Sequence, residues 1–417
     1  MDHYNKNRME AIKVVEALRT GVPTRISTRT LPDLRKNLTE TLRADLDLLT
    51  TGKIPRGRLI WGQYGQGKTH VLTTTEHLAL DRQFAVSFVS LSREVSCHNL
   101  FHFYGRAASR LRTPDSSMFG LERALSKKHA SDLQKTPILV PDRYIHPLPA
   151  IIIENYLHSA GEEQNLLYGD LMGTRIPLTE LKRIHRQNYS EKFPTFETSF
   201  RMIDHAKAYF GCLADTIVFC GYRGWVILID ELELVGRLGS QSRLKAYQNL
   251  QWLLNWSNAH HYPIYVIAAA ATSLQSEMWY GGKDDRTLMP KLAEEKFGKS
   301  AYNEITEFFE YALSPQSLVV TPASEEAISE LLKRIVELHG KAYSWEAKLD
   351  VNSLVRNLGE TTLRTYIRAT LESLDHQFLY HETIQTTPFN FKEKPLTEDN
   401  SFFSNPYSQE NNTENNN

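Results

Sequence analysis

The chain has 417 residues, of which 41% are hydrophobic and 23% are charged, and its formal net charge is −1. This composition is ordinary for a globular protein, and the length predicts two or three structural units. The even charge balance argues against a protein dominated by non-specific attraction to nucleic acid. No apolar run approaches a membrane-spanning length, and the three cysteines lack C-x-x-C spacing. We therefore expect reduced thiols, a cytoplasmic location and no membrane contact.

The first 52 residues are expected to form a helical lead-in. Apolar residues at helical spacing predict a helix over 8–20, which Gly21 and Pro23 end. A second helix is predicted over 33–50, where leucines recur at the same spacing. The lead-in runs directly into the segment that carries the clearest motif.

Residues 57–72, GRLIWGQYGQGKTHVL, match the P-loop pattern G-x-x-x-x-G-K-[ST] between a predicted strand and a predicted helix. The glycines permit a turn whose backbone N–H groups surround phosphate oxygens, and the helix directs its positive end there. Lys68 is expected to reach the β- and γ-phosphates of ATP, and the Thr69 hydroxyl to bind Mg²⁺. A chance glycine-rich turn is the alternative, which the agreement of strand, spacing and helix disfavours. The expected nucleotide-binding residues here are Gly62, Gln63, Tyr64, Gly65, Gln66, Gly67, Lys68 and Thr69.

A second strand is predicted over 84–91, and the segment 92–224 that follows is too long for an ordinary strand connection. We expect a mostly helical insertion there, with helices over 98–112 and 197–215. Its first part carries several arginines among aromatic residues, which is compatible with a nucleic-acid or partner contact. A solvated amphipathic helix is the preferred interpretation.

Three further apolar runs predict strands over 225–235, 262–273 and 317–322, with a helix over 242–258 between them. This alternation of strands and helices indicates a parallel five-stranded sheet flanked by helices. The predicted fold class is therefore α/β, of the P-loop NTPase type, with an ATPase core over 53–320 that contains the insertion.

Asp230 and Glu231 follow four apolar residues, at the carboxyl edge of the sheet where open α/β folds bind ligands. Asp230 is expected to hold Mg²⁺, and Glu231 to polarise the attacking water. A buried strand ending in a charged turn is the alternative, but the preceding P-loop favours catalysis. The strand between the P-loop strand and this one points to the ATPase branch of P-loop proteins, and no guanine-reading Asn-Lys-x-Asp motif occurs.

Positions after the fourth strand are candidates for sensing the γ-phosphate. Thr272 or Ser273 is expected to orient the attacking water, and either is equally suited to cap the next helix. Arg286, in a polar loop beyond, is a candidate arginine finger that acts on the ATP of a neighbouring subunit. A surface arginine paired with the adjacent aspartates is the alternative.

The chain changes character beyond Pro322, and 321–385 are predicted to form a helical lid with helices over 324–340, 345–357 and 361–377. Arg364 and Arg368 share one helical face, from which Arg364 is expected to reach the γ-phosphate. Arg368 is also compatible with a solvated face. The Asn-rich segment 386–417 is expected to be a disordered tail.

Together these features resemble the AAA+ ATPases, especially the branch of origin-recognition and loader ATPases. The resemblance rests on GQYGQGKTH, VILIDELE, the polar end of the fourth strand, and the arginines of the following loop and of the lid. More narrowly, AIKVVEALRTGVPTR and LRTYIRATLESLD are similar to the ATP-binding proteins of bacterial BREX phage-defence systems. The resemblance covers roughly residues 8–95 and 220–380.

The resemblance implies an ATP hydrolase that uses the residues named above, with His70 added to the nucleotide site by its position. Lys68, Asp230, Glu231, Arg286 and Arg364 are then the candidate catalytic residues. Double-stranded DNA and other defence proteins are the implied partners, and assembly of several copies is left open. The alternatives are a DNA loader or remodelling ATPase outside phage defence, and a nucleotide-binding scaffold with little hydrolysis. A metabolic kinase is disfavoured, because no site for an acceptor substrate is visible.

Overall fold

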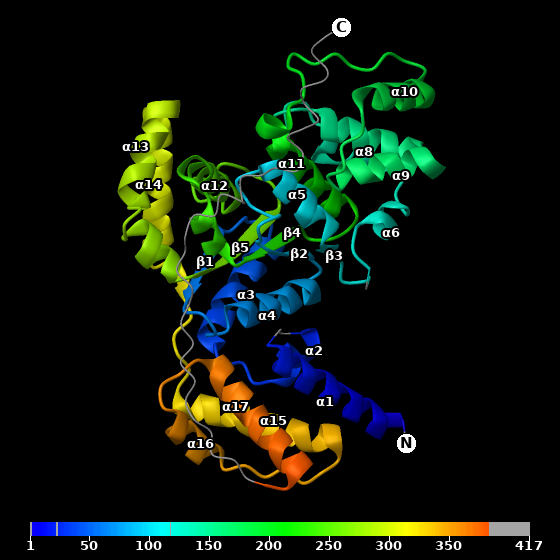
Figure 1. Cartoon of the computed structure of the whole chain (residues 1–417). Coiled ribbons are helices and arrows are strands. Elements are labelled where there is room, and N and C mark those ends of the chain that lie inside the picture. Colours follow the sequence, from blue (N-terminus) through cyan, green and yellow to red (C-terminus); the bar gives the residue numbers. More distant parts are fainter. Residues whose placement is uncertain (1, 22–23, 117, 383–417) are drawn as a thin grey trace.

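The structure is a computed structural model that describes residues 2–21, 24–116 and 118–382. It has a larger lobe built on one sheet and a smaller helical lobe, to which both ends of the described chain contribute (Figure 1). The predicted tail 386–417 and two residues of the GVPTR lead-in, Val22 and Pro23, lie outside the described residues.

A six-stranded sheet forms the centre of the larger lobe, in the order β3-β2-β4-β5-β1-β6. The five predicted strands are all present, and they pair with one another in parallel. The prediction of a purely parallel, five-stranded sheet is wrong, because β3 adds an antiparallel strand beside β2. The strands are β1 Arg58–Gly62, β2 Ala85–Ser90, β3 Leu111–Arg112, β4 Trp225–Asp230, β5 Ile264–Ala271 and β6 Leu318–Val319.

Two local features of the sheet could not be predicted from the sequence pattern. β3 has only two residues, so no alternation of apolar and polar positions marks it. β4 is shorter than the predicted strand over 225–235, because the backbone of Glu231 turns into the left-handed region at φ 59°. The chain then continues as the short 3-10 helix η2, Leu232–Arg237.

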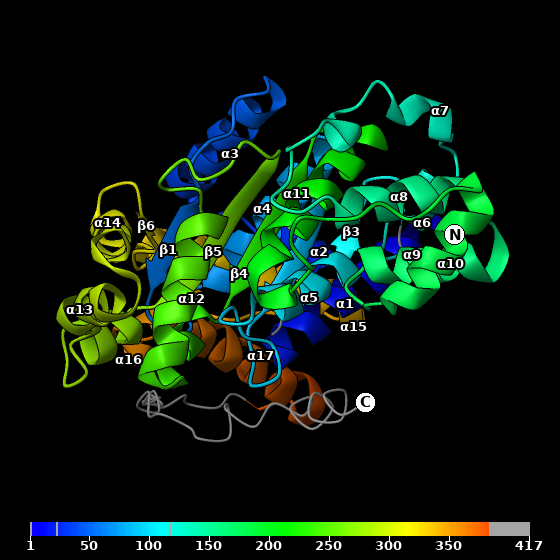
Figure 2. The ribbon, with the colours of Figure 1, turned by 90° about the horizontal axis from the view of Figure 1, so that it is seen from above.

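Helices cover both faces of the sheet (Figure 2). Consecutive residues of β4 alternate between the two cores, which explains why the whole strand is apolar. One face carries α3 Lys36–Thr50 and α4 Lys68–Asp81, and the other carries α5 Leu100–Ser109, α11 Met202–Phe219, α12 Ser240–Leu253 and α14 Lys299–Leu313.

The segment between β2 and β4 is mostly helical, as predicted. A buried carboxylate links its outer part to α11: Asp170 pairs with Arg175 at 2.9 Å and also accepts a hydrogen bond from Tyr209 of α11. Besides α5, β3 and α11, the segment contains α6 Glu122–Leu125, α7 Ala130–Leu133, η1 Pro137–Leu139, α8 Leu148–His158, α9 Gly161–Leu171 and α10 Leu178–Tyr189.

A helical hairpin that the sequence analysis did not predict lies between β5 and β6. It consists of α13 Asp285–Phe297 and α14, preceded by the π-helical turn η3 Leu274–Trp279. The hairpin is held to α12 by Arg243 and Asp285, which pair at 2.9 Å and are 2% and 0% exposed. Arg286 therefore lies in the first turn of a helix, so its predicted place in a polar loop is wrong.

The smaller lobe contains the three predicted lid helices, α15 Glu325–Tyr343, α16 Val351–Leu358 and α17 Leu363–Tyr380. Two helices of the lead-in, α1 Asp2–Thr20 and α2 Arg25–Thr30, share their apolar core (Figure 1). Val14, Val15 and Leu31 are buried in this core together with the lid residue Leu332. The lead-in is thus divided, because α3 packs on the sheet instead. Within the described residues, no helix is both long and apolar enough to cross a bilayer.

Candidate nucleotide-binding site

The P-loop has the structure that its glycines predict. β1 ends at Gly62, the loop turns through Gly65 and Gly67 in the left-handed region at φ 77° and 92°, and α4 begins at Lys68. A side chain at Gly65 would also meet Thr362, whose Cβ lies 3.1 Å from an ideal Cβ position. Thr362 caps the N-terminus of α17. The glycine therefore serves two purposes: it permits the turn, and it lets the lid approach the loop.

Two side chains of the motif make contacts that join the parts of this site. The Lys68 ammonium donates to the carbonyl oxygens of Gly62 and Gln63, at 3.1 and 3.2 Å, so it lies beneath the loop. The Thr69 hydroxyl donates to Asp230 Oδ2 at 2.6 Å, although the two residues are 161 positions apart in the chain. The fold thus joins the P-loop and the acidic strand at one point.

The acidic strand end contains three carboxyl groups rather than the two that were predicted. Asp230 is 4% exposed, and burial raises its pKa although Thr69 and the Glu231 N–H oppose the shift. Burial and the nearby Glu233 and Asp230 raise the pKa of Glu231 to about 7. Glu233 is buried and accepts a hydrogen bond from Ala271 N at 2.9 Å. It connects the end of β5 with Glu231, whose carboxyl is within hydrogen-bonding reach.

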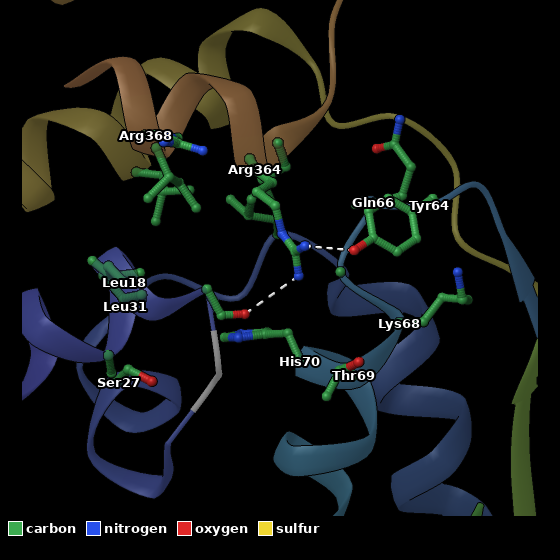
Figure 3. Close-up of a pocket in the computed structure, with 18 of the residues that line it drawn as sticks. Leu18, Ser27, Leu31, Tyr64, Gln66, Lys68, Thr69, His70, Arg364 and Arg368 are labelled. Atoms are coloured by element: carbon green, nitrogen blue, oxygen red, sulfur yellow. Dashed lines mark hydrogen bonds between the residues drawn. The ribbon is translucent and has the colours of Figure 1, made fainter. Parts of the chain in front are cut away.

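A cavity of about 300 Å³ extends from the P-loop between the two lobes (Figure 3). One side is polar and contains Lys68, Thr69, Asp230, Glu231 and Glu233. The other side is formed by α1, α2, α15 and α17 and is mainly apolar. Its apolar lining residues are Ala17, Leu18, Leu31, Pro32, Leu34, Leu331, Leu363 and Ile367. A ligand with a charged end and a flat apolar end fits this division, as ATP does.

Arg364 projects from the first turn of α17 into the mouth of this cavity (Figure 3). Its guanidinium donates to the Tyr64 hydroxyl at 2.7 Å and to the Gly21 carbonyl at 3.5 Å. It also lies over the Tyr64 ring, 5.1 Å from the centroid. Arg364 therefore links the lid, the P-loop and the end of α1. Arg368 also lines the cavity and is paired with Glu372 at 2.9 Å on the exposed side of α17.

Arg35 and His70 are two further polar residues of the cavity wall. Arg35 donates to the P-loop carbonyl of Gln66 at 3.4 Å, and burial lowers its pKa. Its Nε is buried and, within the described chain, has no hydrogen-bond partner. Burial lowers the pKa of His70 as well, which favours the neutral ring. Sequence reasoning missed Arg35 and Glu233, because only the folded chain brings them to the P-loop.

The other predicted site residues divide into those that line this cavity and those that do not. Gly62 and Gln63 face Lys68 through their carbonyl oxygens, whereas Tyr64 to His70 line the cavity. Thr272 follows β5, and its N–H donates to the Gly62 carbonyl at 3.3 Å. Ser273 precedes η3 and makes no side-chain cap. Arg286 is exposed and stacks on Tyr280, 5.3 Å from the ring centroid, so it does not reach the P-loop of its own chain.

The residues present fit a magnesium nucleotide. Thr69 and Asp230 supply two adjacent oxygen donors, which is the ligand type that Mg²⁺ prefers beside phosphates and water. Among the described residues, no group of three or more His, Cys, Asp and Glu side chains could hold a metal ion.

A family model described as the BREX system ATP-binding protein BrxC/D matches residues 7–131 and 201–376, which is well over half of the chain. The chain therefore belongs to this family of ATP-binding defence-system proteins. The match includes the P-loop, the acidic strand and the lid, and it leaves out residues 132–200, which contain α8 to α10. A search among curated proteins finds no match.

Proposed function

We propose that this member of the BREX ATP-binding family hydrolyses ATP with Mg²⁺ and uses the cycle to change the position of its lid. The observation that carries the proposal is the contact between Thr69 and Asp230 beside the Lys68 ammonium. This contact joins the phosphate-binding loop to the buried carboxyl group of Asp230. Glu231, the proposed base, is the residue after Asp230. Phosphoryl transfer depends on such positioning and on the neutralisation of phosphate charge.

Each residue has a separate task in the proposed reaction. The P-loop N–H groups and Lys68 bind the phosphate chain, and Thr69 and Asp230 hold Mg²⁺, which neutralises phosphate charge when bound. Glu231 accepts the proton of the attacking water. In the structure its carboxyl faces Glu233, so the side chain must turn towards the water before it can act as a base.

Two substitutions test this assignment. Lys68→Ala removes a charged hydrogen-bond donor to the phosphates and should weaken ATP binding by about 10- to 100-fold, measured by calorimetry. Glu231→Gln should leave binding intact and slow hydrolysis by about 10²- to 10⁴-fold, the usual share of a general base. Glu295→Gln, an exposed change of the same chemistry, is the control. Full hydrolysis by both site variants would refute the proposal.

The lid contact supports the proposed switch. Arg364 is held by Tyr64 and Gly21, and a bound γ-phosphate offers it a stronger, charged acceptor. A shift of Arg364 from Tyr64 to the nucleotide would move α17, together with the α1 and α2 helices that share its core. Arg364→Ala should therefore reduce the difference in protease sensitivity between the ATP-bound and nucleotide-free protein.

Arg286 remains our proposed arginine finger, acting on a second copy of the chain. Its exposed position, away from its own P-loop, is what action in trans requires. Arg286→Ala should then abolish the concentration dependence of the ATPase rate and leave ATP affinity unchanged. Concentration-independent hydrolysis by the unaltered protein would remove the need for such an arginine.

Within the family we propose the BrxD type, on the likeness of GVPTR and LRTYIRATLESLD. We also propose that the protein acts in the cytoplasm, on double-stranded DNA or on other proteins of the defence system. Gel shifts with duplex DNA over a salt series test the DNA contact, because phosphate contacts make affinity fall steeply with salt. If duplex DNA stimulates hydrolysis and the protein acts outside a defence system, the alternative of a DNA loader is favoured instead.

A nucleotide-binding scaffold with little hydrolysis is the second candidate. The observation that favours it is the contact between Glu231 and Glu233, since a Glu231 side chain held by Glu233 is not available to the water. A single-turnover assay separates the two candidates. Release of phosphate within minutes supports the hydrolase, whereas bound ATP that stays intact supports the scaffold.

A further inference from the structure

We propose that a second cavity, remote from the P-loop, binds the phosphoryl group of a ligand. The cavity has a volume of about 340 Å³ and lies where α12 returns to the start of β5. Because β1, β4 and β5 are parallel, the start of β5 is at the opposite edge of the sheet from Gly62 and Asp230. The inference does not depend on ATP hydrolysis. The lining residues are Arg143, Ile145, Lys207, Trp252, Ala259, His260, His261 and Tyr262.

Lys207 is the first reason to expect an anion. Its ammonium lies over the Trp252 ring, 5.4 Å from the centroid, and is half-buried. Among the described residues it forms no ion pair, and the charged groups that act on it are the positive Lys245 and the negative Glu304. Burial and Lys245 lower the pKa of Lys207. A half-buried cation without a partner is costly, and a bound anion removes that cost.

His260 is the second and independent reason. It is 5% exposed, and neither ring nitrogen has a hydrogen-bond partner within the described residues. The carbonyl groups of Trp252 and Leu253 lie near the ring, but their geometry satisfies neither nitrogen. Most buried polar atoms in folded proteins are paired, so an unpaired imidazole in a cavity wall is a candidate contact for a ligand, which the ring must turn to meet because both of its nitrogens are buried. Burial lowers the pKa of His260 to about 4, so the neutral ring offers one N–H donor.

The site is rigidly built rather than an accident of exposed side chains. Asn255 clamps the main chain of His260 on both sides, with hydrogen bonds of 3.1 Å to its N–H and its carbonyl oxygen. Arg143 is fixed by two bonds to Asp215, at 2.9 and 3.0 Å, and lies over the Tyr262 ring. These bonds occupy Nε and Nη2 of Arg143 and leave Nη1 for a ligand.

The donors favour a phosphoryl group. Lys207 comes from α11, His260 from the loop before β5, and Arg143 from the loop before α8, so they surround the cavity from three segments. A tetrahedral phosphoryl group offers acceptor oxygens in several directions, which suits donors on three sides better than a planar carboxylate does. The group can belong to a small phosphate ester or to a nucleic-acid backbone.

The test measures how fast the unaltered protein is acetylated at individual lysines, by peptide mass spectrometry. Inorganic phosphate at about ten times its Kd should slow labelling of Lys207 about tenfold, because only the ligand-free fraction reacts. Lys128 is the internal control, since its ammonium lies over the Phe219 ring at 5.3 Å and is outside this cavity. The label on Lys68 reports the P-loop separately, so failure of either site is recognised.

A second arm identifies the source of the phosphoryl group. Protection of Lys207 by phosphate but not by short duplex DNA supports a small phosphate ester, and protection by DNA at lower concentration supports a nucleic-acid backbone. Lys207→Met should weaken phosphate binding about tenfold or more in calorimetry of the Lys68→Ala protein, whereas Lys128→Met should not. Two results would overturn the proposal: no protection by either ligand, or equal slowing by chloride at matched ionic strength.

Discussion

Glu231 should make the nucleotide-free protein less stable as the pH rises. Its pKa is raised from the ordinary 4.5 to about 7, chiefly by burial and by Glu233. Between these values the folded chain keeps a proton that the unfolded chain has lost, so the free energy of unfolding falls with increasing pH. At about 1.4 kcal/mol for each pKa unit, and with the shift discounted by about half because Glu231 is only partly buried and solvent screens it, the penalty is about 0.7 kcal/mol near pH 5.5 and about 1.5 kcal/mol near pH 8.5.

Glu231→Gln removes this penalty, because the amide stays neutral and still reaches Glu233. The variant should be more stable than the unaltered protein by about 1.5 kcal/mol near pH 8.5 and by about half of that near pH 5.5. Urea denaturation at the two pH values measures the difference, with the exposed Glu295→Gln as control. A pH-independent difference would show that Glu231 has an ordinary pKa in the folded chain and that the contact with Glu233 is unimportant.

Two further predictions concern packing. Asp285→Ala leaves the Arg243 guanidinium buried without its partner and should destabilise the protein by about 3–5 kcal/mol in the same assay. Asp81→Ala breaks an ion pair that is 61% exposed on the aspartate side and should cost at most about 1 kcal/mol, so equal effects would contradict this reasoning. Gly65→Ala, with its left-handed turn and its contact to Thr362, should weaken ATP binding about tenfold or more, measured by calorimetry. Unchanged ATP affinity would show that the loop adapts.

The P-loop and the acidic strand could be predicted because their signals are local. Each consists of a short apolar strand followed directly by residues whose chemistry is needed at that strand's end. The structure places the predicted strand, turn and helix at Arg58–Gly62 and from Lys68 onwards, and it brings Thr69 to Asp230. Their roles in binding and hydrolysis stay predictions, with the tests given above.

Glu233 could not be predicted, because its position depends on one backbone angle. In the sequence it is one more acid in a charged turn after the strand. The left-handed conformation of Glu231 ends β4 early and turns the chain, so that Glu233 reaches the N–H of Ala271. The helix α13 was missed for a different reason. Pro290 lies inside it, and proline normally indicates the end of a helix.

The apolar wall of the cavity shows a third limit of sequence reading, because its residues come from segments that are far apart in the chain. Within the GVPTR lead-in, Gly21 follows α1 and lines the cavity, and Thr24 precedes α2. Both residues make defined contacts: the Gly21 carbonyl accepts a hydrogen bond from Arg364, and the Thr24 side chain caps α2 by accepting one from the Ser27 N–H. Leu31, in the same wall, is buried in the core that α1 and α2 share with the lid. Gly21 and Leu31 thus contribute to the cavity wall, and Leu31 also contributes to the core of the lobe whose movement we propose. Changes in GVPTR should therefore affect ATP affinity and lid movement together, whereas Lys68→Ala should affect lid movement only through the loss of ATP.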